Sequence, residues 1–246
     1  MSEIKLFVQD PESRSFLTEK FPQFQFELVI DNDNSAVCFC KKKGKLGIQS
    51  EGEKALFLDI DFFSSELQRR RKFFSNKKEN LLKAIGPKAK NLNIFEATAG
   101  LGRESYLLAS AGYNVIACEK SPYLYVLLCL ALDNLYEKLN LNEDQRRLKF
   151  LFGDAVELLR NNTTKIDVIY ADPMFPQAKK SALVKKNMQV LHKMDLSDDK
   201  PLELLNNFKE VSEAKIVFKR PSEAPVLDES ACKEYYENDT IRFEVY

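Results

Sequence analysis

The chain has 246 residues, enough for one α/β domain and a small appendage, and its composition, 44% hydrophobic and 30% charged, is that of an ordinary globular protein. Its apolar runs fall short of the ~20 residues that cross a membrane, and the first residues lack the apolar core of a signal peptide. The formal net charge is zero, so no overall field attracts nucleic acid. We therefore expect a cytoplasmic protein with no membrane partner.

Cysteine and histidine usage argues against a metal site. The five cysteines are odd in number and mostly have apolar neighbours, which favours reduced core residues. Cys38 and Cys40 form one C-x-C pair without a second pair, and His192 is the only histidine. Because this set does not match a zinc-ligand pattern, no metal is expected.

Residues 1–68 are predicted to form a small β-rich domain. Segment 24–30 alternates and then runs apolar, and the Asp-Asn-Asp-Asn sequence at 31–34 signals a turn. Further short strands are expected at residues 37–40, 47–48 and 55–60. Nothing in this segment indicates a function.

Two clusters of basic residues are candidate RNA contacts. The first includes Arg71 and Lys72, on a helix expected over residues 66–85 that Gly86 and Pro87 end. The second cluster lies further along the chain and comprises Lys179, Lys180, Lys185 and Lys186. Such residues can neutralise RNA phosphates, although basic runs are more often solvated helix faces.

The stretch from residue 92 to residue 104 predicts a strand, a tight loop and a helix. A short apolar run is followed by Thr98, Gly100 and Gly102, and helical spacing of apolar residues begins at Tyr106. Glycines let the backbone bend close to a ligand, and a helix N-terminus presents free N–H groups to an anionic group. This loop is therefore a candidate cofactor site, and the alternative is an ordinary glycine turn between a strand and a helix.

Strands and helices alternate over the rest of the chain. Strands are expected at 113–119, 148–152, 166–171, 214–218 and 240–245, and helices from residue 122 to about 138, after residue 154, and at 201–211. This order predicts a mostly parallel, Rossmann-like α/β sheet with helices on both faces, forming a domain over 69–246. Ligands of such sheets bind at the carboxyl ends of the strands, where Gly100, Glu119, Asp154 and Asp172 fall.

Glu119 indicates which cofactor the loop binds. It ends the second strand, where a carboxylate can hydrogen-bond both hydroxyls of a ribose, although a helix-capping acid is the simpler alternative. The G-x-G-x-x-G spacing of dinucleotide sites is absent, and Arg103 and Glu104 open the helix instead. S-adenosylmethionine, which carries an amine and a carboxylate, is therefore favoured over a nicotinamide dinucleotide.

The fourth strand ends in a motif typical of base methylation. Asp172, Pro173 and Phe175 resemble the D/N-P-P-Y/F signature of methyltransferases that act on exocyclic base amines. The carboxylate and the Pro173 carbonyl can accept the two hydrogens of the amine and free its lone pair, while Phe175 stacks on the base. The alternative is an Asp-Pro turn after a buried strand.

Three stretches, 97–104, 172–176 and 181–186, together resemble the small-subunit rRNA guanine-N2 methyltransferase J family (RsmJ). The resemblance covers roughly residues 66–225 and includes the matching segment 217–221. It implies a class I fold and methyl transfer from S-adenosylmethionine to N2 of a guanine near the 3′ end of 16S rRNA. The implied partner is 16S rRNA or the small ribosomal subunit.

The resemblance also assigns cofactor positions to this chain. They are Arg103, Glu104, Glu119, Lys120, Asp154, Ala155 and Asp172. The chain departs from the family where Asp154 and Ala155 replace a Ser-Ser pair and Lys120 replaces an arginine. Two rival functions stay open, namely an adenine-N6 methyltransferase and a non-catalytic RNA-binding protein that kept the fold. The presence of Arg103, Glu119 and Asp172 argues against the second.

Overall fold

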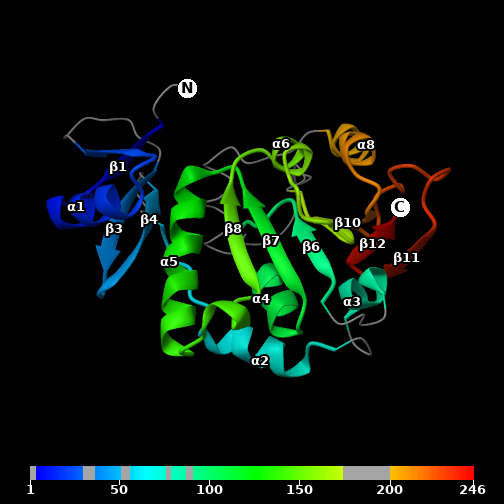
Figure 1. Cartoon of the computed structure of the whole chain (residues 1–246), viewed down its shortest axis with the longest axis horizontal. Helices are drawn as coiled ribbons and strands as arrows, with labels where there is room; N and C mark the ends of the chain where they lie inside the picture. The colour runs from blue at the N-terminus through cyan, green and yellow to red at the C-terminus, as the bar shows by residue number, and fades with distance from the viewer. Residues whose placement is uncertain (1–3, 30–36, 51–55, 76–78, 87–90, 174–199) are drawn as a thin grey trace.

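Two β-sheets lie on either side of one long helix, as Figure 1 shows. The computed structural model describes residues 4–29, 37–50, 56–75, 79–86, 91–173 and 200–246. Within these residues the first sheet has five strands, all from the N-terminal quarter of the chain, and the second has seven.

The first sheet has the strand order β2-β1-β3-β4-β5. Its elements are β1 (Lys5–Val8), α1 (Pro11–Lys20), β2 (Gln25–Leu28), β3 (Val37–Lys42), β4 (Lys45–Ser50) and β5 (Phe57–Leu58). β1 runs parallel to β2 and β3, whereas β3, β4 and β5 are antiparallel. The sequence analysis missed β1 and α1, although Asp10 caps α1 by accepting a hydrogen bond from the Ser13 N–H, and Pro11 follows as the first helical residue.

The second sheet has the strand order β11-β12-β10-β9-β6-β7-β8. The strands are β6 (Asn93–Glu96), β7 (Asn114–Glu119), β8 (Leu148–Phe152), β9 (Val168–Ala171), β10 (Lys215–Pro221), β11 (Glu234–Glu237) and β12 (Ile241–Val245). Neighbours from β8 to β10 are parallel, and β12 lies antiparallel between β10 and β11. The predicted parallel sheet is confirmed, while the edge strand β11 had not been predicted.

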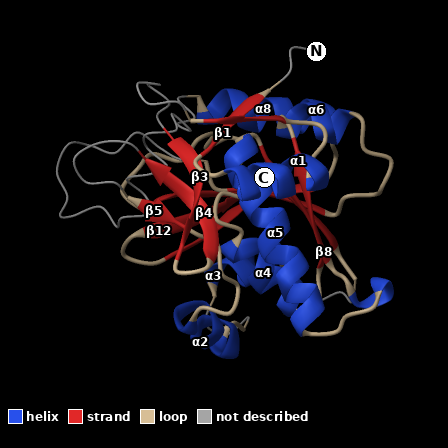
Figure 2. Cartoon of the chain, turned by 90° about the vertical axis from the view of Figure 1, so that its left-hand side faces the viewer, coloured by secondary structure: helices blue, strands red, loops and turns tan. Residues whose placement is uncertain are grey.

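Helices cover both faces of the second sheet. They are α2 (Ser65–Phe73), α3 (Asn80–Ile85), α4 (Arg103–Ser110), α5 (Pro122–Lys138), α6 (Ala155–Arg160) and α8 (Pro201–Val211), with a 3₁₀ turn at Glu143–Gln145. Side chains alternate along each strand, so Ile94 packs with α3, α4 and α5, whereas Phe95 packs with α6 and α8. Figure 2 shows α6 and α8 side by side on their face of the sheet.

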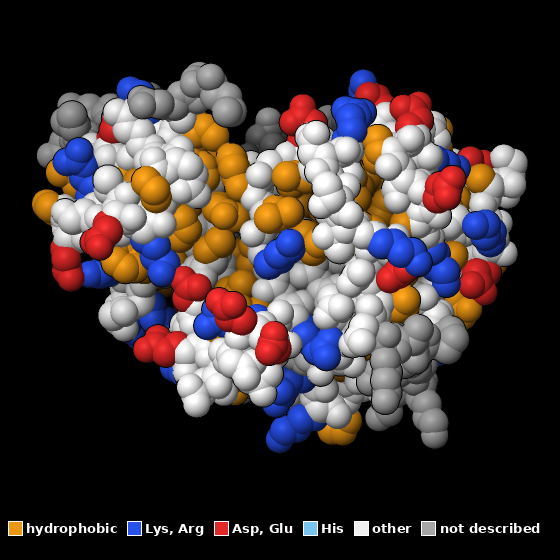
Figure 3. All heavy atoms as spheres, viewed as in Figure 1, with side chains coloured by type: hydrophobic (Ala, Val, Ile, Leu, Met, Phe, Trp, Pro, Cys, Tyr) orange, Lys and Arg blue, Asp and Glu red, His pale blue; other side chains and the backbone are white. Residues whose placement is uncertain are grey.

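Helix α5 belongs to two hydrophobic cores. Leu128 and Leu132 pack with the second sheet, whereas Leu124 and Leu127 pack with the first. In Figure 3 hydrophobic side chains gather between the two sheets, over α5 and β8, while acidic and basic side chains intermingle elsewhere on this face. The division of the chain at residue 68 stays a prediction, because the two sheets share this helix.

The prediction of one continuous helix over residues 66–85 is wrong, because two helices, α2 and α3, occupy this segment. Phe74 has an extended backbone that ends α2, and its ring packs against the core of the second sheet. A separate helix, α3, begins at Asn80, and Gly86 caps its end, as the sequence had indicated. The φ of Gly86 is 104°, a value that favours glycine.

Candidate active site

The two glycines of the loop between β6 and α4 have different roles. Both have positive φ values, 55° at Gly100 and 67° at Gly102. A Cβ at Gly100 would meet no atom within 4 Å, whereas one at Gly102 would lie 2.6 Å from Leu128 Cδ2 of α5. Gly100 therefore leaves open space beside the loop, and Gly102 allows the start of α4 to pack tightly against α5.

A cavity of about 120 Å³ lies at the carboxyl ends of β6, β7, β8 and β9. The sequence-predicted residues that line it are Thr98, Gly100, Glu119, Lys120, Asp154, Ala155, Asp172 and Pro173. Leu124 and Leu204 add apolar side chains from α5 and α8. Four separate loops thus meet where a parallel sheet binds its ligands.

Glu119 is a buried carboxylate at the edge of this cavity. Its oxygens accept hydrogen bonds from the Gly100 N–H at 2.9 Å and the Ser121 N–H at 2.8 Å. Burial raises the pKa of Glu119 to about 7, although these two N–H groups act to lower it. A carboxylate oxygen has two lone pairs, so each Glu119 oxygen can accept one more hydrogen bond from a donor on a ligand.

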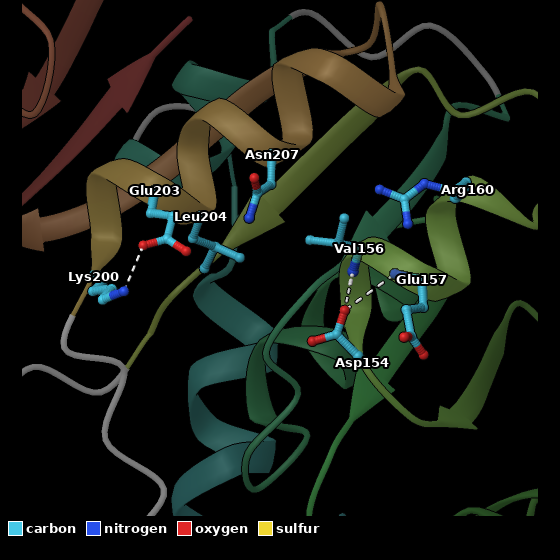
Figure 4. Close-up of a pocket in the computed structure, with 8 residues that line it drawn as sticks. All are labelled: Asp154, Val156, Glu157, Arg160, Lys200, Glu203, Leu204 and Asn207. Atoms are coloured by element: carbon cyan, nitrogen blue, oxygen red, sulfur yellow. Dashed lines mark hydrogen bonds and ion pairs between the residues drawn. The ribbon is translucent and has the colours of Figure 1, made fainter.

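Asp154 occupies the start of α6 (Figure 4). One carboxylate oxygen accepts hydrogen bonds from the Val156 N–H at 2.9 Å and the Glu157 N–H at 3.1 Å. Asp154 and Leu204 line both the cavity above and a neighbouring groove of about 450 Å³ between α6 and α8. The groove carries charges of both signs, including a Lys200–Glu203 ion pair of 2.9 Å.

Asp172 directly follows β9 and is held by two neighbours. Its backbone N–H donates to Thr98 Oγ1 at 2.7 Å, which links the end of β9 to the glycine loop. Its carboxylate Oδ2 forms a 2.5 Å ion pair with Lys219 Nζ of β10. Burial raises the pKa of Asp172, and the Lys219 ammonium opposes this effect. Lys219 was not among the predicted site residues, although it directly follows the apolar run of the fifth predicted strand.

Arg103 and Glu104 do not line the cavity, although Glu104 interacts electrostatically with Asp172, which does. Glu104 accepts a hydrogen bond of 2.8 Å from Arg70 of α2. Burial acts to raise the pKa of Glu104, but Lys219 and Arg70 outweigh it, so the pKa is lowered. Arg103 faces Glu66 at 3.5 Å, in a second groove beside α2. The structure therefore places Glu104 beside the Asp172–Lys219 pair and Arg103 in the groove next to α2.

The remaining predicted site residues are Phe175 and the basic candidates for RNA contacts. Arg71 and Lys72 are exposed on α2 and do not line the cavity. Those outside the described residues are Phe175, Lys179, Lys180, Lys185 and Lys186. In the described part of the chain, no cluster of three or more His, Cys, Asp or Glu residues could hold a metal ion. No helix among the described segments is long and apolar enough to span a bilayer.

Comparison with known proteins identifies the family. A family model described as "Putative SAM-dependent methyltransferase" matches residues 19–246. "Ribosomal RNA small subunit methyltransferase J" of Pectobacterium atrosepticum is 32% identical over 89% of both chains. The protein of the same name from Francisella philomiragia is 38% identical over 79% of this chain and 81% of its own. The chain belongs to the ribosomal RNA small subunit methyltransferase J family.

A solved structure shares the fold of nearly the whole chain. The crystal structure of a SAM-dependent methyltransferase from Neisseria gonorrhoeae matches with a TM-score of 0.70, covering 98% of this chain and 95% of that one, at 24% sequence identity. The predictions of a Rossmann-like class I methyltransferase fold, of membership in this family and of S-adenosylmethionine as the cofactor are confirmed.

Proposed function

We propose that this methyltransferase J family member transfers a methyl group from S-adenosylmethionine to the exocyclic N2 of a guanine in 16S rRNA, in the cytoplasm. The observation that carries the proposal is the position of Asp172 and Pro173, which border the same cavity as Gly100 and Glu119. The names of the relatives support small-subunit rRNA as the substrate. The choice of guanine N2 rests on the motif resemblance.

The residues of the cavity fit this cofactor. Glu119 offers a buried carboxylate for the ribose hydroxyls, and the space beside Gly100 admits a ligand close to the backbone. Asp154 and Ala155 would hold the adenine, while Thr98 and the start of α4 would face the amino-acid part. When bound, S-adenosylmethionine supplies a methyl group on a positively charged sulfur, which is already a strong electrophile.

Asp172 acts on the guanine amine. Its carboxylate and the carbonyl of Pro173 accept the N–H hydrogens, which directs the nitrogen lone pair towards the methyl group. As the N–C bond forms and the S–C bond breaks, the amine loses one proton to solvent. Phe175 follows two residues later as the stacking platform for the flipped base.

Two groups of basic residues hold the RNA backbone. Arg71 and Lys72 are exposed on α2 and have no described acidic partner, so they are available to phosphates. The lysines at 179, 180, 185 and 186 are proposed to contribute further phosphate contacts next to the Asp-Pro motif. Such local contacts suit a chain whose net charge is zero.

The test is a substitution at the centre of the proposed chemistry. Asp172→Ala should abolish methyl transfer with the fold retained, because the carboxylate orients the guanine amine. The loss should fall on turnover more than on RNA affinity. The assay is single-turnover transfer from radiolabelled cofactor to undermethylated small-subunit RNA, with cofactor affinity measured in parallel. Asp228→Ala is a matched control, since Asp228 also pairs with a lysine, Lys209, at 3.0 Å but lies outside the cavity.

Mass mapping of rRNA from a deletion strain, complemented with each variant, identifies the product. Loss of one N2-methylguanine, restored by the wild type and by Asp228→Ala but not by Asp172→Ala, supports the proposal. A missing N6-methyladenine would favour the adenine alternative, and RNA binding without any transfer would favour a non-catalytic RNA-binding protein. Full activity of Asp172→Ala would show that the motif is a structural turn.

A further inference from the structure

We propose that Lys219 is a positioning residue for methyl transfer, whose ammonium group holds the Asp172 carboxylate ionised and fixes its orientation at the cavity. This inference rests on the proposed function of Asp172 in the preceding section. Lys219 lies in the segment 217–221 that matches the family, but it was not among the predicted site residues.

The sheet itself brings the two residues together. The last paired positions of β9 and β10 are Ala171 and Phe218, and β10 continues to Pro221 because it pairs with β12 on its other side. Lys219 is therefore held on a strand where β9 has already ended, directly beside Asp172. Its Nζ lies 2.5 Å from Asp172 Oδ2, and no other described side chain donates to this carboxylate.

The surrounding charges make Lys219 the counter-ion of Asp172. Burial acts to lower the pKa of Lys219. The negative charges of Asp172 and Glu104 outweigh this effect and raise the pKa, so the lysine is cationic. Glu104 already has its own partner, Arg70, at 2.8 Å. Glu96 is fully buried, and burial raises its pKa well above the ordinary value, which favours the protonated carboxyl. Three described carboxylates, Asp172, Glu104 and Glu79, thus share two cations, Arg70 and Lys219, and only Lys219 contacts Asp172.

The one further titratable group on β9 is neutral as well. Burial raises the pKa of Tyr170 well above its ordinary value, so this phenol adds no charge beside Asp172. Removing Lys219 would leave Asp172 in a desolvated site with Glu104 as its nearest charge, and both conditions favour the protonated carboxyl. A protonated carboxyl accepts hydrogen bonds poorly and would not draw hydrogens from an amine.

The experiment compares Lys219→Met and Lys219→Arg with a matched control, Lys209→Met. Lys209 pairs with Asp228 at a similar side-chain exposure, outside the cavity. The first readout is the carboxyl titration of ¹³C-labelled aspartate in the free protein, with the Asp172 signal assigned through Asp172→Asn. Lys219→Met should raise the pKa of Asp172 by roughly 1–3, as expected for loss of an adjacent opposite charge.

The second readout is the pH profile of single-turnover transfer. In Lys219→Met the acidic limb should move to higher pH, with a loss of roughly tenfold for each unit by which the Asp172 pKa exceeds the assay pH. Activity should return at alkaline pH, and Lys219→Arg should keep most of it at neutral pH. Affinity for S-adenosylhomocysteine and the melting temperature should stay close to those of Lys209→Met.

The possible outcomes are distinguishable. An Asp172 titration that does not move in Lys219→Met overturns the inference, as does a uniform loss of activity at all pH values. Weaker S-adenosylhomocysteine binding with an unchanged pH profile would make Lys219 a cofactor ligand instead. If the wild-type protein does not methylate rRNA at all, the proposed function fails, whereas a failure confined to Lys219 leaves wild-type transfer intact.

Discussion

At the scale of single residues, Glu119 shows how burial prepares a group for binding. Its pKa of about 7 lies above the ordinary 4.5, so the folded protein binds a proton more tightly than the unfolded chain does. This group therefore lowers the free energy of unfolding as the pH rises from about 4.5 to about 7. A ligand that donates hydrogen bonds to the ionised carboxylate offsets this cost.

Cofactor affinity should therefore depend on pH. Binding of S-adenosylhomocysteine should tighten roughly fivefold to tenfold between pH 6 and pH 8, because Glu119 ionises over this range and then accepts ribose hydroxyls more strongly. Titration calorimetry at several pH values measures the effect. Glu119→Gln, which cannot ionise, should bind more weakly and with little pH dependence. Equal affinity of the wild type at both pH values would contradict a ribose contact.

At the scale of elements, the loop between β6 and α4 separates packing from ligand binding. Gly102 lies against Leu128 of α5, whereas the space beside Gly100 is open. The two positions therefore allow one chemical change, glycine to alanine, to test the two roles separately.

Gly102→Ala should lower the free energy of unfolding by about 1–3 kcal/mol, because the new methyl group overlaps Leu128 and the positive φ disfavours alanine. Gly100→Ala should lower the free energy of unfolding by about 1–2 kcal/mol, the cost of a positive φ at alanine alone. It also places a methyl group at the cavity wall. Denaturant unfolding should therefore show the larger loss for Gly102→Ala, and calorimetry the larger loss of cofactor affinity for Gly100→Ala. The reverse order would show that Gly102 is the position that faces the ligand.

Helix α2 provides a second test at this scale. Arg71→Ala and Lys72→Ala should each lower the log–log salt slope of RNA binding by roughly 1, since each would remove one phosphate contact. Lys165→Ala is the control, because this exposed lysine precedes β9 at the edge of the sheet opposite the cavity. Filter binding over a range of salt concentrations gives the slopes. Unchanged slopes for both α2 variants would mean that this helix face is only solvated.

Sequence patterns predicted the elements whose signals are local. The strands that end at Glu119 and Ala171 are buried apolar runs, and their carboxyl ends bring the predicted cofactor residues to one cavity. The division of the basic helix at Phe74 was missed, because it depends on packing against a distant core. Lys219 was missed because its role requires β10 to extend past β9, which pairing with β12 produces.

At the scale of the whole molecule, aromatic contacts join the two sheets. Phe24 of the N-terminal segment is 4% exposed and packs edge-to-face against Phe152, with ring centroids 5.0 Å apart, and against Tyr125 at 6.2 Å. We propose that the predicted N-terminal domain, residues 1–68, unfolds together with residues 69–246, because α5 completes the core of both.

Phe24→Ala should lower the free energy of unfolding by about 3–5 kcal/mol, through lost burial and the cavity that remains. The whole chain should still unfold in one transition, with the same midpoint in far-ultraviolet circular dichroism and in tyrosine fluorescence. Phe16→Ala is the matched control, since Phe16 is 46% exposed and its loss should change little. Two separate transitions in Phe24→Ala would show instead that the N-terminal domain folds on its own.

The place of α5 in the sequence also determines the order in which the protein can fold during its synthesis. Strands β1 to β5 are translated first, yet the residues that cover their apolar face, among them Leu124 and Leu127, are translated much later. The strands of the first sheet therefore leave the ribosome before α5 is available to complete their core. The core of the first sheet is thus completed only after α5 has been translated, and until then its apolar face favours aggregation.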